Sequence, residues 1–206
     1  MQNFSKKEAI SFGWESFKAN WGFLVSISLF AAFLNFAPVF LSYLPKDLSI
    51  LATVGGVAFW IIQMVVAIGI TKIYLLISKN QPSDFPDLFG SFRLFFRFLL
   101  GTIASSLIIF VGLILFIIPG IILAVRLSFW AYALVESDLG PIEAIKESWR
   151  ITEGHTINLF IFNFLLGLLN VLGFLALFAG LLLTVPMTRL ASVYVFRKLA
   201  QTTSTL

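Results

Sequence analysis

The sequence predicts an all-α integral membrane protein with six transmembrane helices arranged as three hairpins. Of its 206 residues, 59% are hydrophobic, 24 are Phe and only 12% are charged, whereas about 25% of residues are charged in an average soluble domain. Thirteen of the fourteen Lys and Arg residues fall on one side of the predicted spans. The positive-inside rule makes that side cytoplasmic, with both termini on it. We therefore expect one polytopic domain over residues 1–206 in a bacterial cytoplasmic (inner) membrane.

The amino-terminal segment, residues 4–20, predicts an amphipathic surface helix. Ile10, Trp14 and Phe17 recur at helical spacing between charged residues. A cleavable signal peptide would place an apolar core of about 7–15 residues directly after its basic start, but the first long apolar run begins only near Trp21. We expect this helix to lie uncleaved at the cytoplasmic surface, with Trp14 at headgroup depth.

Spans can be counted because a transmembrane helix needs about 20 apolar residues. The turn Leu44-Pro45-Lys46-Asp47 separates the first two spans. The apolar run from Phe98 to Val135 would be about 57 Å long as one helix, so it must fold back as a hairpin. Its turn could lie at Pro119-Gly120 or near Val111-Gly112; we favour the second, because the first makes the returning helix too short. The six predicted spans are residues 21–43, 48–77, 92–111, 113–135, 157–178 and 181–196.

A five-span alternative treats the run from Phe98 to Val135 as one kinked helix. It places Lys146 and Arg150 on the far side of the membrane, against the positive-inside rule.

A second surface helix is predicted over residues 141–153, with Pro141 in its first turn and Trp149 on its apolar face. The run Glu8-Ala9-Ile10 followed by Trp14 recurs here as Glu143-Ala144-Ile145 followed by Trp149. Either this echo is chance, or the chain holds three units, each a surface segment and a hairpin. In that case the second helix of each pair is loosened near its start, at Gly55-Gly56, Pro119-Gly120 and Pro186.

Arg126 is the most informative single residue. If its helix continues to Glu136, Arg126 lies about 15 Å from the cytoplasmic end, close to mid-membrane. Either it snorkels and hydrogen-bonds as a structural residue, or it binds an anionic group such as a lipid phosphate. The candidate headgroup contacts are Arg126, Arg189, Trp149, Arg150 and Trp14, and the candidate polar residues of the bundle interior are Asn35, Gln63, Ser105, Ser106, Asn163 and Asn170.

Residues that carry chemistry are scarce. The chain has no Cys and one His, His155, which we expect to cap or flank the fifth span. Asp84 and Asp87 are expected to serve a turn. No catalytic motif and no carboxylate at depth within a predicted span is found, so we expect no enzyme, no metal site and no cofactor.

Three stretches are similar to a bacterial family of six-span membrane proteins of unknown function, which includes the YciC-like proteins and the membrane domain attached to glycerophosphoryl diester phosphodiesterases. They are 87–92, the Pro119-Gly120 break with its flanking Ile residues and Arg126, and 143–160. The resemblance implies a helical membrane domain and carries no active-site residue across.

The predicted function is therefore a non-enzymatic, lipid-interacting or membrane-organising role. A transporter of a lipid or small amphiphile, or an accessory subunit of a membrane complex, is the alternative. The expected partners are membrane lipids, anionic phospholipid included, and a protein partner or a second copy is compatible with the sequence. Nucleic acid is not expected, because Lys and Arg flank apolar runs and form no basic block.

Overall fold

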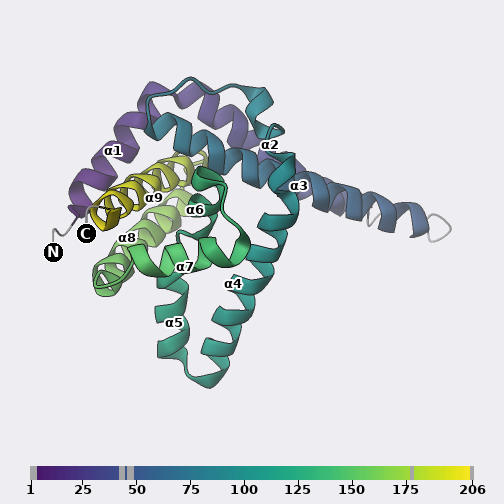
Figure 1. Cartoon of the computed structure of the whole chain (residues 1–206). Coiled ribbons are helices and arrows are strands. Elements are labelled where there is room, and N and C mark those ends of the chain that lie inside the picture. The colour runs from purple at the N-terminus through teal and green to yellow at the C-terminus, as the bar shows by residue number, and fades with distance from the viewer. Residues whose placement is uncertain (1–3, 42–44, 46–48, 177–178, 205–206) are drawn as a thin grey trace.

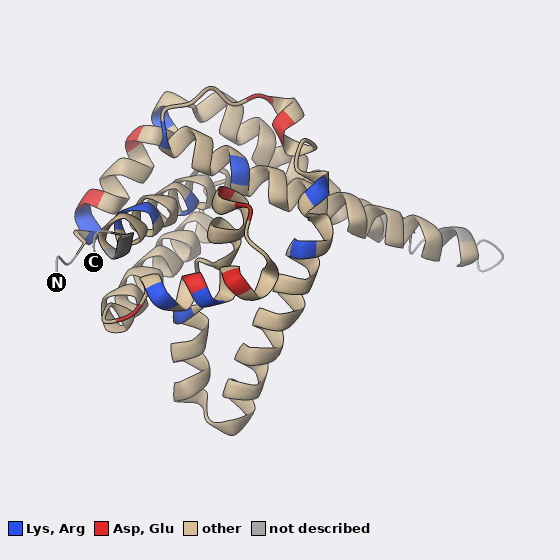
Figure 2. Ribbon diagram, viewed as in Figure 1, with Lys and Arg blue, Asp and Glu red and all other residues tan. Residues whose placement is uncertain are grey.

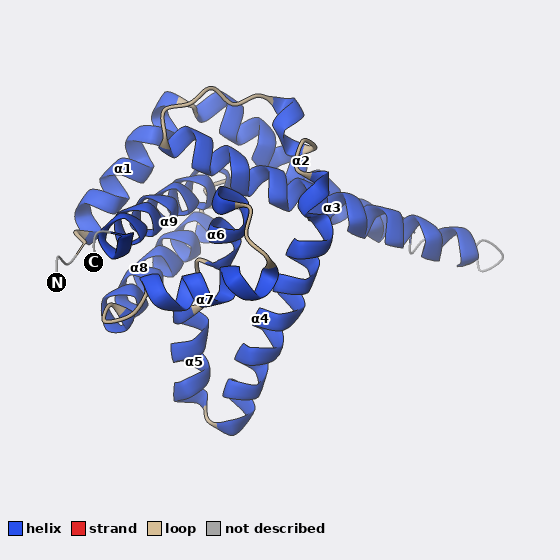
Figure 3. Ribbon diagram, in the orientation of Figure 1, coloured by secondary structure: helices blue, strands red, loops and turns tan. Residues whose placement is uncertain are grey.

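The structure is a computed structural model that describes residues 4–41, 45, 49–176 and 179–204. These residues form helices and their connections, without a strand (Figures 1 and 3). The predicted all-α class is thus confirmed. The helices are α1 (Lys6–Ala19), α2 (Trp21–Leu41), α3 (Ser49–Ser78), the short 3₁₀ turns η2 (Phe85–Leu88) and η3 (Phe92–Leu94), α4 (Phe95–Leu115), α5 (Ile117–Arg126), α6 (Trp130–Ser137), α7 (Pro141–Ile151), α8 (Thr156–Leu175) and α9 (Leu181–Ser204).

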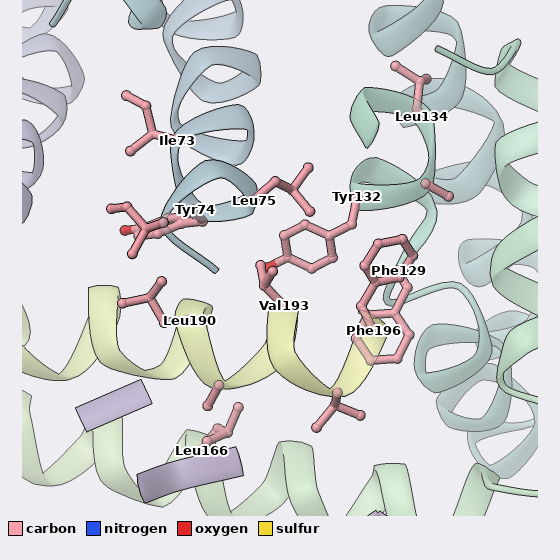
Figure 4. Close-up of a cluster of buried hydrophobic side chains, with 14 of the residues drawn as sticks. Ile73, Tyr74, Leu75, Phe129, Tyr132, Leu134, Leu166, Leu190, Val193 and Phe196 are labelled. Atoms are coloured by element: carbon pink, nitrogen blue, oxygen red, sulfur yellow. The ribbon is translucent and has the colours of Figure 1, made fainter. Parts of the chain in front are cut away.

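Two hairpins extend from a central bundle. Figure 1 shows α3 and the α4–α5 pair leaving the bundle in different directions, with α7 across the base of α4 and α5. The centre of the bundle is α9, on which Leu190, Val193 and Val195 are fully buried. In Figure 4, side chains from α3, α6, α8 and α9 meet, and the rings of Phe129 and Phe196 lie 5.9 Å apart.

Helix α1 packs antiparallel along α9. Ser5 caps its start by accepting a hydrogen bond from the Glu8 amide at 3.3 Å. Its buried stripe is Ala9, Gly13 and Phe17, and small residues there allow two helix backbones to approach closely. The predicted surface segment is thus a separate helix, α1, and one of its faces packs against α9.

Five helical segments are long and apolar enough to cross a membrane: Trp21–Val39, Thr53–Ser78, Phe85–Leu115, Ile117–Ser137 and Thr156–Leu175. They indicate a membrane protein. Helix α9 includes the sixth predicted span. Its residues Arg189, Arg197 and Lys198 make α9 less apolar than these five segments.

The turn of the second hairpin differs from the prediction. Helix α4 continues to Leu115, and the chain reverses at Phe116, which has an extended backbone (φ −160°, ψ 142°). The favoured position near Val111-Gly112 was wrong, and so was the break at Pro119-Gly120. Pro119 lies in the first turn of α5, where a helix lacks partners for its amide hydrogens, so the ring removes no hydrogen bond.

The other predicted helix breaks are also absent. Gly55-Gly56 lies inside α3 and Pro186 inside α9, and both helices run through these positions. The turn predicted at residues 44–47 lies outside the described residues except for Pro45.

Charged residues cluster on the bundle, while α3 beyond the bundle and the tip of the α4–α5 hairpin carry none among the described residues (Figure 2). Five ion pairs connect segments of the bundle that are distant in sequence. They are Lys72–Asp87 (2.8 Å), Lys79–Glu136 (2.8 Å), Arg93–Asp138 (2.9 Å), Arg97–Asp138 (3.0 Å) and Lys198–Glu8 (3.1 Å).

Candidate functional site

Arg126 ends α5 and lies against the first residue of α8. Its Nε donates a hydrogen bond to Thr156 Oγ1 at 3.3 Å, and its guanidinium carbon lies 4.2 Å from the centre of the Trp149 ring of α7. Stacking of a guanidinium on Trp contributes about 0.5–2 kcal/mol, more where water is excluded. No carboxylate among the described residues pairs with Arg126. Its positive charge is therefore held in place but not neutralised.

A helix break fixes the Arg126 backbone. The chain leaves helical geometry after Arg126 and resumes at Trp130, so α5 and α6 are separate helices. The Ser148 hydroxyl spans the gap: it donates to the Arg126 carbonyl at 2.8 Å and accepts from the Phe129 amide at 3.2 Å. Thr152 also donates to this carbonyl, at 3.3 Å. These bonds replace the helical partners that the break removes.

The predicted mid-membrane depth of Arg126 assumed one helix from the hairpin turn to Glu136. That helix is interrupted, because α5 has 10 residues and stops at Arg126. The Arg126 side chain lies beside the beginning of α8 and beside α7, and its depth in the membrane stays a prediction.

The groove beside Arg126 is apolar. It lies between α5 and α8, has a volume of about 280 Å³ and contains no polar lining apart from Thr156. Ile118 and Ile157 on its walls are 72% and 77% exposed. Val125, which precedes Arg126, and Thr156, which accepts the Arg126 hydrogen bond, both line this groove. The arrangement joins a cation, an indole ring and a channel for hydrocarbon.

The six polar residues predicted to face the bundle interior do not converge on Arg126. Gln63 donates to the Leu34 carbonyl at 2.7 Å and so joins α3 to α2, and Asn170 lies 3.4 Å from Thr188 Oγ1 and so joins α8 to α9. Asn35 and Ser105 bond to carbonyls of their own helices. Ser106 is exposed and Asn163 is half-buried.

The remaining headgroup candidates lie at separate places. Trp149 is 39% exposed, because α7 faces the bundle through Ala144, Ser148 and Ile151 instead. Arg150 is paired with Glu147, whose hydrogen bonds raise the pKa of the guanidinium above its usual value. Trp14, on α1, lies beneath the Lys18 ammonium at 5.5 Å.

Arg189 lines a second, larger cavity, of about 540 Å³, formed by α2, α3, α4, α6, α9 and the α5–α6 connection. Tyr74 and Tyr132 line it as well. Sequence reasoning missed both tyrosines. The available signal was weak, because all 4 Tyr residues of the chain fall within predicted spans and none stands out from the others.

Two further sequence features have structural roles. Asp87 accepts from the Asp84 amide at 3.0 Å and pairs with Lys72, as expected of a turn. His155 precedes α8 and is buried, and its Nδ1 has no hydrogen-bond partner among the described residues. Within the described ranges, no group of three His, Cys, Asp or Glu residues could hold a metal.

A family model matches residues 39–206, that is, the end of α2 and everything after it. The chain belongs to the family DUF7847, a domain of unknown function. The DUF7847 match includes Arg126, Trp149 and Arg189 and excludes α1, so both candidate arginines belong to the shared domain.

Mycobacterial proteins are also similar to the chain. They are the uncharacterized proteins Mb2590 of Mycobacterium bovis and MT2637 and Rv2560 of Mycobacterium tuberculosis, each 29% identical over 147 residues. The aligned part is 71% of this chain and 45% of each relative, so the chain spans less than half the length of these curated relatives. No solved structure matches.

Proposed function

We propose that this DUF7847 protein is a non-enzymatic membrane protein that binds an anionic phospholipid beside Arg126. The phosphate would contact the guanidinium, and an acyl chain would occupy the groove between α5 and α8. The observation that carries the proposal is the position of an unpaired Arg126 beside an exposed, apolar groove, to whose Thr156 it hydrogen-bonds.

An unpaired cation near hydrocarbon costs free energy. Insertion scales assign about 2.5–3.5 kcal/mol to Arg at the centre of a membrane helix, and less near the interface. Thr156 takes one of the five guanidinium N–H groups of Arg126. The fork of the remaining donors suits phosphate oxygens, and charge-assisted bonds of this kind are stronger than neutral ones.

The groove between α5 and α8 would hold the other end of the lipid, its acyl chain. Ile118, Ile121, Ile157 and Phe160 line a channel that no protein segment among the described residues fills. In a membrane this channel would be occupied by hydrocarbon. Trp149 beside the guanidinium is a residue type enriched at headgroup depth, which supports a phosphate at that level.

The same proposal includes six membrane segments with both termini cytoplasmic, in the inner membrane of a bacterium. The clustering of charge at the bundle end supports one cytoplasmic side. The α8–α9 pairing, in which Gly173 approaches Gly180, supports α9 as the returning helix of a third hairpin despite its three basic residues.

A second candidate function is transport of a lipid or small amphiphile. The Arg189 cavity favours it, because helices from all three hairpins line it. Transport predicts that ligand changes the exposure of this cavity, whereas a binding or organising role does not.

The test is native mass spectrometry of the protein extracted in mild detergent. Wild type, Arg126→Leu and Arg93→Leu would be compared at equal monodispersity. Arg93 is the matched control, because it also loses one guanidinium but pairs with Asp138 in the structure. We expect anionic phospholipid retained by wild type and Arg93→Leu and lost from Arg126→Leu.

A second variant separates lipid binding from folding. Ile121→Trp would fill the groove and leave Arg126 in place, so it should reduce phospholipid occupancy as well. Equal occupancy in wild type and in both groove variants would overturn the proposal and leave Arg126 as a structural residue.

A further inference from the structure

The cavity beside Arg189 is separate from the groove at Arg126 and has a different shape. With a volume of about 540 Å³, it lies within the range of roughly 300–1,000 Å³ that is usual for small-molecule pockets. Five helices and a connection line this cavity, whereas only α5 and α8 line the groove at Arg126.

Arg189 brings an uncompensated charge to this cavity. It forms no ion pair with any residue that the structure describes, and its side chain hydrogen-bonds to that of Tyr132. Arg189 itself is exposed to the cavity, although its neighbours on α9, Thr188 and Leu190, are 4% and 0% exposed. A guanidinium that faces a cavity without a carboxylate partner keeps its donors available for an anionic group.

The hydroxyl groups around Arg189 divide into two sets. Ser28, Thr71 and Ser128 donate to carbonyls of their own segments at 2.8–2.9 Å, so their hydrogens are already used. Tyr74 and Tyr132 donate to no residue in the described part of the chain. Both rings lie over the stretch of α9 that carries Leu190 and Val193 (Figure 4). Two hydroxyl donors and one guanidinium thus remain for a ligand.

The rest of the cavity is largely apolar. From Arg189 its wall continues along α9 through Val185 and Leu182 to Leu181, eight residues or about 12 Å of helix. Ala31 and Ile70 face the same space from α2 and α3. One end therefore offers donors for an anion, and the other offers contact for hydrocarbon.

We propose that this cavity binds an anionic amphiphile with a single apolar chain. Its carboxylate or phosphate head accepts hydrogen bonds from Arg189, Tyr74 and Tyr132, and its chain extends toward Leu181. A fatty acid and a monoalkyl phosphate present this same chemistry. The inference is independent of the proposed phospholipid site, because the two positions share no lining residue.

The experiment is isothermal titration calorimetry of the full chain in a non-ionic detergent. The probes are dodecanoate, dodecyl phosphate and, as a neutral control of equal chain length, dodecanol. We expect wild type to bind at least one anion, and Arg189→Gln to bind it at least tenfold more weakly. Arg93→Gln, which removes a guanidinium that is paired with Asp138 and lines neither site, should bind as wild type does. The stronger of the two anions identifies the head group that the cavity prefers.

Two further variants keep the result interpretable if Arg189→Gln folds poorly. Val185→Trp should block the cavity and abolish binding while Arg189 is retained, and Arg189→Lys should restore part of the affinity by restoring the charge. Equal binding of dodecanol and the anions by wild type would refute a charge-selective site. Unchanged anion binding in Val185→Trp would refute this cavity as the location. A loss caused by Arg126→Gln alone would assign the ligand to the other site.

Discussion

Replacement of Gly13 by Ala tests whether α1 is bound to α9 or only rests at the membrane surface. A Cβ at position 13 would lie 2.5 Å from the carbonyl oxygen of Met187 and 3.1 Å from Ala191 Cβ. Ordinary contact begins at 3.4 Å, so α1 would have to withdraw by roughly 1 Å. The obstacle is a backbone carbonyl inside a helix, which cannot rotate away as a flexible side chain can.

The magnitude follows from two opposing terms. Overpacking of a close contact typically costs about 1–3 kcal/mol, whereas Gly→Ala inside a helix gains up to about 1 kcal/mol. Gly167→Ala in α8 is the matched control, because a Cβ there meets nothing within 4 Å. The two variants should therefore differ by about 1–3 kcal/mol, with Gly13→Ala the less stable.

Thermal unfolding in detergent, followed by loss of the monodisperse peak, measures this difference. For a chain of 150–250 residues, 1 kcal/mol corresponds to about 2–4 °C in Tm. Equal melting of the Gly13→Ala and Gly167→Ala variants would refute the reasoning, because the α1–α9 contact would then be absent from the folded protein.

Three other substitutions test separate contacts. Ser148→Ala should lower stability by about 1–3 kcal/mol, since it leaves the buried Phe129 amide without its acceptor, while the Arg126 carbonyl keeps its bond from Thr152; Ser26→Ala, exposed and bonded within its own helix, is the control, and equal melting of the two would contradict the role of Ser148. Gly120→Ala should lower Tm by several degrees, since its Cβ would lie 2.7 Å from a backbone atom of α4; an unchanged Tm would contradict that close approach. Asp87→Asn breaks the partly exposed pair with Lys72 and should cost at most about 1 kcal/mol, with the Tm difference shrinking in 1 M salt; a difference that persists there would exclude a screened ion pair.

The existence of the helices could be predicted from the sequence, because long apolar runs and amphipathic segments depend on local composition. The turn at Phe116 could not, because Phe has no turn preference. Its position follows from packing: Gly112 and Gly120 are equally distant from Phe116, and a Cβ on Gly112 would lie 3.1 Å from the Gly120 Cα. Such glycine pairs mark where two antiparallel helices approach, and Gly173 with Gly180 does the same between α8 and α9.

The candidate site was predictable in identity but not in geometry. An Arg inside an apolar run stands out in any reading of the sequence, so Arg126 and Arg189 were both identified. The break after Arg126 depends on Ser148, 22 residues away, and no local pattern encodes that contact. The pairing of Arg189 with Tyr132 likewise joins two helices that are separated by 57 positions in the chain.

The α4–α5 hairpin has a consequence for how the protein enters the membrane. Its tip, Leu113–Ile118, is entirely apolar, and the turn satisfies its own backbone: the Phe116 amide donates to Gly112 and the Gly120 amide to Phe116. The nearest basic residues, Arg97 and Arg126, both lie at the base of the hairpin, so no charge has to pass through hydrocarbon during insertion. The connection between α2 and α3 carries Lys46 and Asp47, each costing about 2.5–3.5 kcal/mol at the membrane centre. In the topology proposed above, the α4–α5 hairpin can therefore enter from the cytoplasmic side as a preformed unit, whereas the α2–α3 connection depends on the insertion machinery to carry its charges across.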